Sequence, residues 1–163
     1  MKEKSFDEVN SMLLNGEERK VRGMLVDPDT GRIKREYAWD KNHAWYCVGD
    51  ADFKMGKYKD AIKSFRKAYG YDSDDVQCLL AIGNCFDVMK EPKKAENILK
   101  KALDIGLKGK VRSAVIFNLG NALFDQERFD EAIAYYLDVK NRRDEIGKKA
   151  RKNIKLILDD KND

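Results

Sequence analysis

The sequence predicts an all-α protein built from repeated helical hairpins that stack as a solenoid. Its 163 residues are 42% apolar and 38% charged, with only two prolines, a composition typical of helices that keep one face in water. Three segments of the chain resemble one another, and apolar residues recur in them at three- and four-residue spacing. A chain of this length can bury roughly 70% of its unfolded surface and fold by itself.

The first element expected is a short helix close to the N-terminus. Ser5 and Glu8 have the spacing of a capping box, in which two side chains bond backbone N–H groups at a helix start. The pair Asn15-Gly16 is typical of a helix end. Apolar residues between these signals share one helix face, namely Phe6, Val9 and Leu13.

The next element expected is a turn at Asp27–Gly31, whose residues favour tight turns. We expect it to join two short strands, Met24–Val26 and Arg32–Lys34. Residues 1–41 do not share the pattern that repeats later in the chain. We therefore expect this irregular segment, with its helix and hairpin, to cap the repeats, with formation of a homodimer or loose order as the alternatives.

The three similar segments share a glycine, an alanine twelve residues later and a large apolar residue four positions further. These triplets are Gly49/Ala61/Phe65, Gly83/Ala95/Leu99 and Gly120/Ala132/Tyr136. Successive glycines are 34 and 37 residues apart, and three extra residues are expected in the glycine-bearing loop 104–110. Small residues at the first two positions let a pair of helices approach closely.

This pattern resembles the tetratricopeptide repeat, a helix–turn–helix unit of about 34 residues. Trp45-x-x-Val48-Gly49 matches the residues that open the unit. The resemblance as a whole covers about Asn42–Glu145. Asp52 departs from the pattern, because the family usually has an aromatic residue there. Second helices are marked at their start by Tyr58, Pro92 and Phe129.

The resemblance implies a right-handed solenoid in three parts. An N-terminal segment takes residues 1–41, three repeats take 42–146, and a C-terminal capping helix takes 147–163. The repeats are expected at about 42–75, 76–112 and 113–146. The capping helix would cover the last repeat with the apolar stripe Ala150, Ile154 and Ile157/Leu158.

The net charge of +4 comes from 33 basic and 29 acidic residues. The excess of basic residues lies in residues 140–163. Nucleic-acid-binding proteins usually spread such an excess over a face, so we expect no nucleic-acid partner. The alternative is a basic adaptor that contacts nucleic acid or an anionic surface through its C-terminal helix.

The location expected for the protein is the cytoplasm. No stretch approaches 18 apolar residues, so no membrane span is predicted, and the charged N-terminus lacks the apolar run of a signal peptide. The three cysteines are an odd number in apolar helical patterns, which predicts reduced thiols; they are Cys47, Cys78 and Cys85.

No complete catalytic set can be assembled from the sequence, so we predict that the chain is not an enzyme and has no cofactor. His43, the only histidine, is one helical turn from Cys47, but no oxyanion-binding element accompanies the pair. We interpret them as a groove histidine beside a packing thiol. Cys78 and Cys85 lack the close spacing and the further ligands of a zinc site, so no metal is expected.

The resemblance also implies a concave groove lined by the first helix of each repeat. Aromatic rings there can fill side-chain pockets, and carboxamides can bond the N–H and C=O of an extended peptide. The alternative is that some rings pack against residues 1–41 and leave the groove partly filled. The residues expected to bind a peptide are His43, Tyr46, Asp50, Phe53, Gln77, Leu80, Asn84, Asp87, Phe117, Asn118, Asn121 and Phe124.

We therefore predict a non-catalytic protein–protein interaction module, a scaffold that binds a peptide segment of another protein in this groove. Its acidic residues would favour a neutral or basic ligand. A subset of the family binds chaperone C-termini with a clamp of Lys, Asn and Arg side chains. None of the clamp residues is present in this chain, where the corresponding positions hold Tyr46, Asp50, Ala81, Ala114 and Asn118. The alternative in the same class is a secretion-type chaperone, which is similar in length and repeat number but typically acidic.

Overall fold

The computed structural model describes residues 2–106 and 108–160, and these residues form nine α-helices, a short 3-10 helix and one isolated β-bridge. The all-α fold class predicted from the sequence is confirmed. The chain divides into two compact units, Met1–Cys85 (unit 1) and Phe86–Asp163 (unit 2). The division falls inside helix α5, Val76–Val88.

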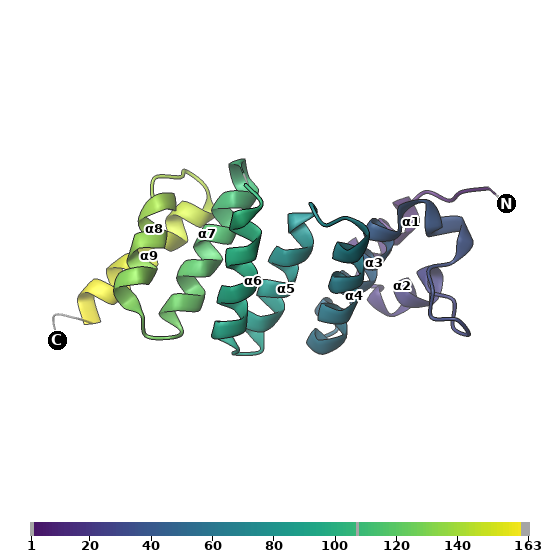
Figure 1. Cartoon of the computed structure of the whole chain (residues 1–163), viewed down its shortest axis with the longest axis horizontal. Helices are drawn as coiled ribbons and strands as arrows, with labels where there is room; N and C mark the ends of the chain where they lie inside the picture. Colours follow the sequence, from purple (N-terminus) through teal and green to yellow (C-terminus); the bar gives the residue numbers. More distant parts are fainter. Residues whose placement is uncertain (1, 107, 161–163) are drawn as a thin grey trace. The chain divides into compact units, whose positions relative to one another are not determined.

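Unit 1 opens with an N-terminal segment of three short elements: α1 (Asp7–Leu14), α2 (Glu18–Leu25) and the 3-10 helix η1 (Arg35–Asp40). The first repeat hairpin follows, with α3 (Lys41–Lys54) and α4 (Tyr58–Tyr71) side by side (Figure 1). A three-residue turn joins the two helices, which makes them an antiparallel pair.

A shared apolar core joins the N-terminal segment to α3. Four side chains of the segment are at most 1% exposed and cluster with Val48 of α3; they are Val9, Val21, Leu25 and Tyr37. Val21 and Leu25 are one helical turn apart, so burying both favours a helix in an otherwise charged stretch. The segment therefore packs on the first repeat, while its roles as a cap or dimerisation element stay predictions.

The capping box predicted at Ser5 and Glu8 is wrong. Helix α1 begins at Asp7, so its N-cap residue is Phe6, whose side chain makes no capping hydrogen bond, and Ser5 accepts the backbone N–H of Asp7 at 3.3 Å and not that of Glu8. The Ser5 hydroxyl donates to the Asp7 carboxylate at 2.7 Å instead. The reason is the burial of Phe6, which is 6% exposed with its ring 5.4 Å from the Tyr37 ring and so fixes the entry of the chain.

The two predicted strands are also wrong, although the turn between them forms. Helix α2 continues to Leu25, and a single antiparallel bridge joins Val26 to Ile33. In the turn, the Asp27 carboxylate accepts the backbone N–H of Thr30 at 2.8 Å. This hydrogen bond and others to the same carboxylate lower the pKa of Asp27.

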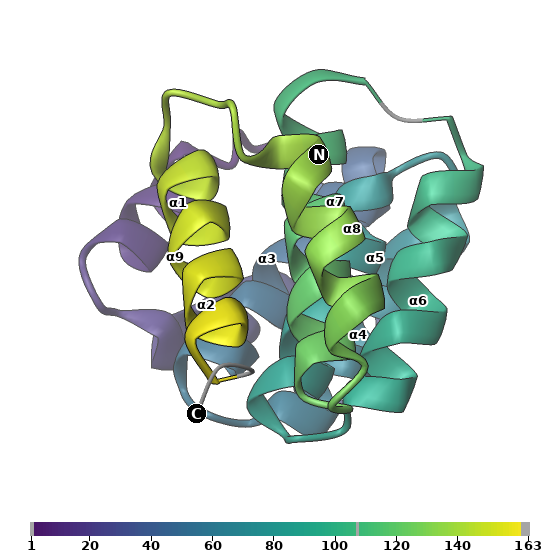
Figure 2. The same cartoon turned by 90° about the vertical axis from the view of Figure 1, so that its left-hand side faces the viewer.

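Unit 2 contains the remaining helices: α6 (Pro92–Asp104), α7 (Gly109–Phe124), α8 (Phe129–Val139) and α9 (Glu145–Asp160). Helix α9 lies beside α8 (Figure 2). It begins two residues before the capping helix that the sequence predicts, and residues 161–163 of that helix lie outside the described residues. Ala150 and Ile157 are buried as expected, but Leu158 is 47% exposed.

The glycine and the large apolar residue are contact partners in the first and third triplets. A Cβ atom on Gly49 would lie 2.6 Å from the Phe65 ring, and one on Gly120 would lie 2.5 Å from the Tyr136 ring. Real Cβ atoms do not approach carbon so closely, so the first helix of the hairpin needs glycine at this position to accept the ring of the second.

Candidate peptide-binding site

Four of the predicted groove residues line one small cavity in unit 1. Tyr46, Asp50 and Phe53 have helical spacing and lie on one face of α3, while Asn84 comes from α5. The cavity has a volume of about 100 Å³, and its full lining is Tyr46, Asp50, Phe53, Phe65, Ala81 and Asn84. We call it the peptide cavity.

The peptide cavity combines aromatic walls with one acidic side. The Tyr46 ring lies 5.3 Å from the Phe65 ring, and the Phe53 ring lies 5.3 Å from that of Tyr58. Burial, followed by the charge of Asp50, raises the pKa of Tyr46 to about 12. The phenol therefore stays protonated at neutral pH and can donate a hydrogen bond to a ligand carbonyl.

The N-terminal end of the same α3 face is covered by the N-terminal segment. The Phe6 ring meets the His43 ring edge-on at 4.6 Å, which is the arrangement that the alternative interpretation expects. His43 Nε2 lies 3.5 Å from Cys47 Sγ. Burial raises the pKa of Cys47 to about 12, so a thiolate nucleophile is disfavoured at this pair.

Two further residues predicted on α5 do not line the peptide cavity. Gln77 is exposed in the first turn, where its backbone N–H donates to the Asp75 carboxylate at 2.9 Å. Leu80 is half-buried one turn later. In unit 1, the predicted face therefore contributes four of its seven residues to one cavity.

In unit 2, helices α8 and α9 contact the face of α7 that the sequence predicts to bind a peptide. Asn121 Oδ1 accepts the Tyr136 hydroxyl at 2.8 Å and Asn153 Nδ2 at 3.3 Å. The Phe117 ring lies 5.7 Å from the Tyr136 ring. The prediction that Asn121 offers its carboxamide to a peptide therefore needs correction, because the oxygen is already bonded from α8 and α9.

Phe124 is likewise part of the contact between α7, α8 and α9. Its ring lies 5.5 Å from the Phe129 ring, and both line a cavity of about 210 Å³ with Leu156 and Ile157 of α9. Asn118 is half-buried on α7. The sequence could not show that α9 would contact Asn121 and Phe124, because their spacing fits a groove and a helix contact equally well.

Asp87, the last predicted residue, is half-buried in unit 2 beside another acid. Burial and then the charge of Asp125 raise its pKa, while the charge of Lys90 lowers it. Lys90 Nζ lies 3.9 Å from Asp125 Oδ2. The carboxylates of Asp87 and Asp125 together form a small acidic patch, which favours a basic group nearby.

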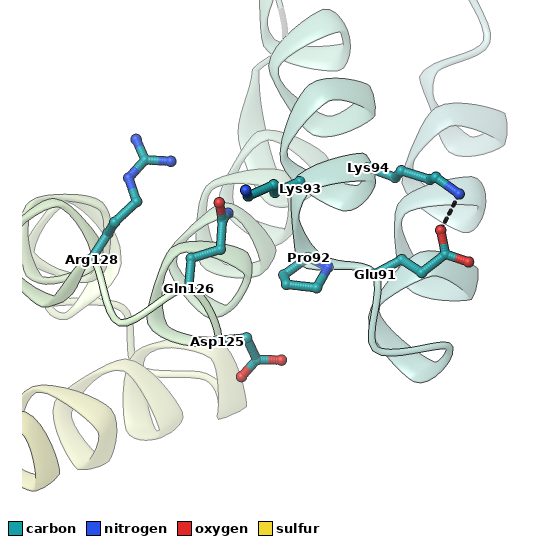
Figure 3. Close-up of a pocket in the computed structure, with 7 residues that line it drawn as sticks. All are labelled: Glu91, Pro92, Lys93, Lys94, Asp125, Gln126 and Arg128. Atoms are coloured by element: carbon teal, nitrogen blue, oxygen red, sulfur yellow. Dashed lines mark ion pairs between the residues drawn. The ribbon is translucent and has the colours of Figure 1, made fainter.

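Sequence reasoning missed a larger cavity of about 650 Å³ at two turns of unit 2 (Figure 3). Several of its charged residues form ion pairs: Lys94 pairs with Glu91, and Arg128 Nη1 lies 2.7 Å from Glu96 Oε2. No sequence signal marks it, because charged turn residues are common. Its lining is Glu91, Pro92, Lys93, Lys94, Asp125, Gln126 and Arg128.

Sequence models of the tetratricopeptide repeat match residues 52–114 and 118–145, and together they span more than half of the chain. The chain belongs to the tetratricopeptide repeat family. The family membership predicted from the spacing of glycine, alanine and a large apolar residue is thus confirmed. Among curated proteins, none matches this chain in sequence.

Several solved structures are similar in fold. One is the type III secretion translocator chaperone SycD of Yersinia enterocolitica, with a TM-score of 0.68, 20% identity, and coverage of 75% of this chain and 95% of SycD. A crystal structure of MamA has a TM-score of 0.62 and 18% identity, and the match covers 89% of this chain and 68% of that MamA chain. A structure of MamA MSR-1 has a TM-score of 0.65 and 20% identity, and the match covers 96% of this chain and 84% of that one.

The family and these likenesses confirm an all-α helical repeat solenoid. The family by itself supports a role as a protein–protein interaction module. Tetratricopeptide repeats are in general non-catalytic interaction repeats. Within the described residues, no helix has both the length and the apolar character needed to cross a bilayer.

Proposed function

We propose that this protein is a non-catalytic scaffold that binds a short peptide segment of a partner at the peptide cavity. One side chain of the peptide enters between Tyr46 and Phe53, and the peptide backbone lies along α3 and α5. The observation that carries the proposal is the convergence of four residues, chosen from repeat register alone, on one cavity.

The volume and charge of the cavity define the side chain that fits. About 100 Å³ is roughly three times the volume of a water molecule in the liquid, so the cavity accepts one short side chain. Asp50 lies 3.2 Å from Lys54 across the exposed edge of the helix, which leaves the cavity without excess positive charge. A small apolar or weakly basic side chain is the best match.

The experiment selects peptides from a random phage-displayed library on the full chain and measures their affinity by calorimetry. Asn84→Ala should weaken a selected peptide by about two- to tenfold, because a lost hydrogen bond contributes about 0.5–1.5 kcal/mol. Asn97→Ala, the same change at an exposed position on α6, should leave affinity unchanged and serves as the matched control.

Two results would contradict the proposal. One is a set of selected peptides whose affinity is the same for Asn84→Ala and the natural chain. The other is loss of binding in Lys148→Glu/Lys152→Glu, on the exposed side of α9. The second result would favour the basic adaptor, whose affinity should also fall steeply with salt.

A secretion-type chaperone is the second candidate. It is favoured by the likeness to SycD, 95% of which is covered by this chain. A chaperone should keep an equimolar partner from aggregating when the partner is diluted out of denaturant, whereas a passive scaffold should not. Light scattering of the partner, with and without the full chain, separates the two.

The cysteines support a cytoplasmic location for this function. Cys47, Cys78 and Cys85 are buried and form no disulfide with one another. Burial is the main cause that raises the pKa of all three thiols. Unpaired cysteines persist mainly in reducing compartments.

A further inference from the structure

A second cavity of unit 1 lies between the N-terminal segment and the first repeat hairpin. Its volume is about 720 Å³, within the range of roughly 300–1,000 Å³ that is usual for small-molecule sites. It shares no residue with the peptide cavity. Its lining is Gly31, Arg32, Ile33, Arg35, Ala38, Lys41, Trp45, Lys67, Gly70 and Tyr71. We call it the basic cavity.

Two arginines of the N-terminal segment give this cavity guanidinium groups without carboxylate partners. Arg32 follows the turn at Asp27–Gly31, and Arg35 begins η1. Both are exposed, and neither forms an ion pair anywhere in residues 2–106 and 108–160. Guanidinium groups match phosphate and carboxylate oxygens with paired hydrogen bonds.

Two lysines on the repeat side of the cavity lie over aromatic rings instead of pairing with acids. Lys67 Nζ lies 3.9 Å from the centre of the Trp45 ring, and Lys41 Nζ lies 5.4 Å from the centre of the Tyr71 ring. A cation–π contact holds the ammonium group in place but leaves its charge available. Tyr71 is 57% exposed, so part of its surface is open to a ligand.

Three carboxylates near these bases in the sequence have other partners. Glu36 lies 3.8 Å from Lys4, Asp40 accepts the backbone N–H of His43 at 2.9 Å, and Asp72 accepts that of Asp74 at 3.0 Å. No acid lines the cavity itself. Four like charges around one concave space repel one another unless an anion binds.

We propose that the basic cavity binds a small organic phosphate. A single carboxylate would neutralise one of the four cations, whereas a phosphate ester carries a charge of about −1.5 to −2 and offers three acceptor oxygens. The phosphate lies between Arg32 and Arg35, and the organic part packs against the open face of Tyr71. Gly31 and Gly70 have no side chain to obstruct the ligand.

The test titrates the full chain with four probes at constant ionic strength of about 0.15 M: adenosine diphosphate, pyrophosphate, adenosine and hexaglutamate. Calorimetry gives the affinities. Trp45 reports on the cavity in a Trp39→Phe variant, because the chain has only two tryptophans. We expect saturable binding of adenosine diphosphate, weaker binding of pyrophosphate, and none of adenosine.

A charge-matched pair of variants separates the cavity from general basic character. Arg32→Gln/Arg35→Gln should weaken adenosine diphosphate more than tenfold and leave the melting temperature unchanged, since both residues are exposed and unpaired among the described residues. Arg143→Gln/Lys152→Gln removes the same charge from exposed positions of unit 2 and should change affinity less than twofold.

Three outcomes would overturn the proposal. Adenosine diphosphate could fail to saturate at about 1 mM, a concentration that still detects weak binding. Hexaglutamate could bind more tightly than adenosine diphosphate, which would make the cavity a site for acidic peptide. The two double variants could lose affinity equally, which would mean non-specific attraction. None of these results bears on the peptide cavity.

Discussion

Arg22 Nη2 of α2 lies 2.6 Å from Asp52 Oδ2 of α3, an ion pair between residues thirty positions apart in the chain. Asp52 is 2% exposed and occupies the repeat position where the family usually has an aromatic residue. The Ser64 hydroxyl donates to the same oxygen at 3.4 Å. Since an unpaired buried carboxylate is costly, the N-terminal segment supplies the partner that the first repeat needs.

Removing the arginine should therefore destabilise unit 1. Arg22→Ala leaves Asp52 buried without its cation, and we expect a loss of about 2 kcal/mol, below the full cost of breaking a buried pair because Arg22 is half-exposed. Arg19→Ala on the same helix, exposed, should cost less than about 0.5 kcal/mol. Urea unfolding measures both, and equal losses would contradict the pairing.

The close approach of Gly120 to Tyr136 predicts a cost for adding one methyl group. A Cβ atom on Gly120 would lie 2.5 Å from the buried ring, so Gly120→Ala should cost about 1–3 kcal/mol. Gly23 lies inside α2 with no atom within 4 Å of its Cβ position. Gly23→Ala should gain up to about 1 kcal/mol, and a stable Gly120→Ala in urea would refute the contact.

The contact between Asn121 and α9 predicts an effect on stability and none on binding. Asn121→Ala removes the acceptor of the Tyr136 hydroxyl and of Asn153, so we expect a loss of about 1–2 kcal/mol. Peptide affinity at the cavity of unit 1 should stay the same. Thermal unfolding and calorimetry on one preparation check both statements; weaker peptide binding without destabilisation would restore Asn121 as a binding residue.

Removing α9 should expose the apolar side of unit 2. Truncation after Asp144 deletes Ala150 and Ile157, which are buried against the cluster that contains Tyr136 and Val139. If four large side chains lose half of their burial, the cost is about 3–6 kcal/mol. We expect a lower melting temperature and aggregation. Lys148→Gln/Lys149→Gln keeps the helix and should melt as the natural chain does.

Glu96 predicts how the stability of unit 2 depends on pH. Burial acts to raise its pKa, but hydrogen bonds from Lys100 and Gln126 and the charges of Lys100 and Arg128 together hold it below the usual value. Lys100 Nζ lies 2.6 Å from the carboxylate. A carboxyl group whose pKa is lower in the folded state stabilises the fold above its unfolded pKa of about 4.3, and this contribution is lost as the pH falls through the folded pKa.

The free energy of unfolding should therefore decrease as the pH falls from about 5 to about 3, and the decrease should be smaller in Glu96→Gln. Glu127→Gln, an exposed control in the same unit, should keep the slope of the natural chain. Urea unfolding at a series of pH values gives both slopes. If Glu96→Gln and the natural chain show the same slope, Glu96 does not contribute to the acid sensitivity.

The repeat register is determined by the sequence alone. Glycine, alanine and the large apolar residue meet within one hairpin, so their spacing follows directly from helix periodicity and a short turn. The contacts of Gly49 with Phe65 and of Gly120 with Tyr136 are of this local kind. The same register placed Tyr46 and Asn84 at the peptide cavity, because both lie on first helices of neighbouring repeats.

Tertiary structure alone decided what lies against those helices. The stretch that forms α2 is too charged to predict a helix by itself, and it is fixed by burying Val21 and Leu25 and by the pair of Arg22 with Asp52. The position of Asn121 in the repeat is that of a groove residue, yet its side chain accepts a hydrogen bond from Asn153 of α9, 32 residues later in the chain. The basic cavity likewise joins residues 31–45 to residues 67–71. Local periodicity states which side of a helix is apolar, whereas the partner of that side depends on contacts between residues far apart in the sequence.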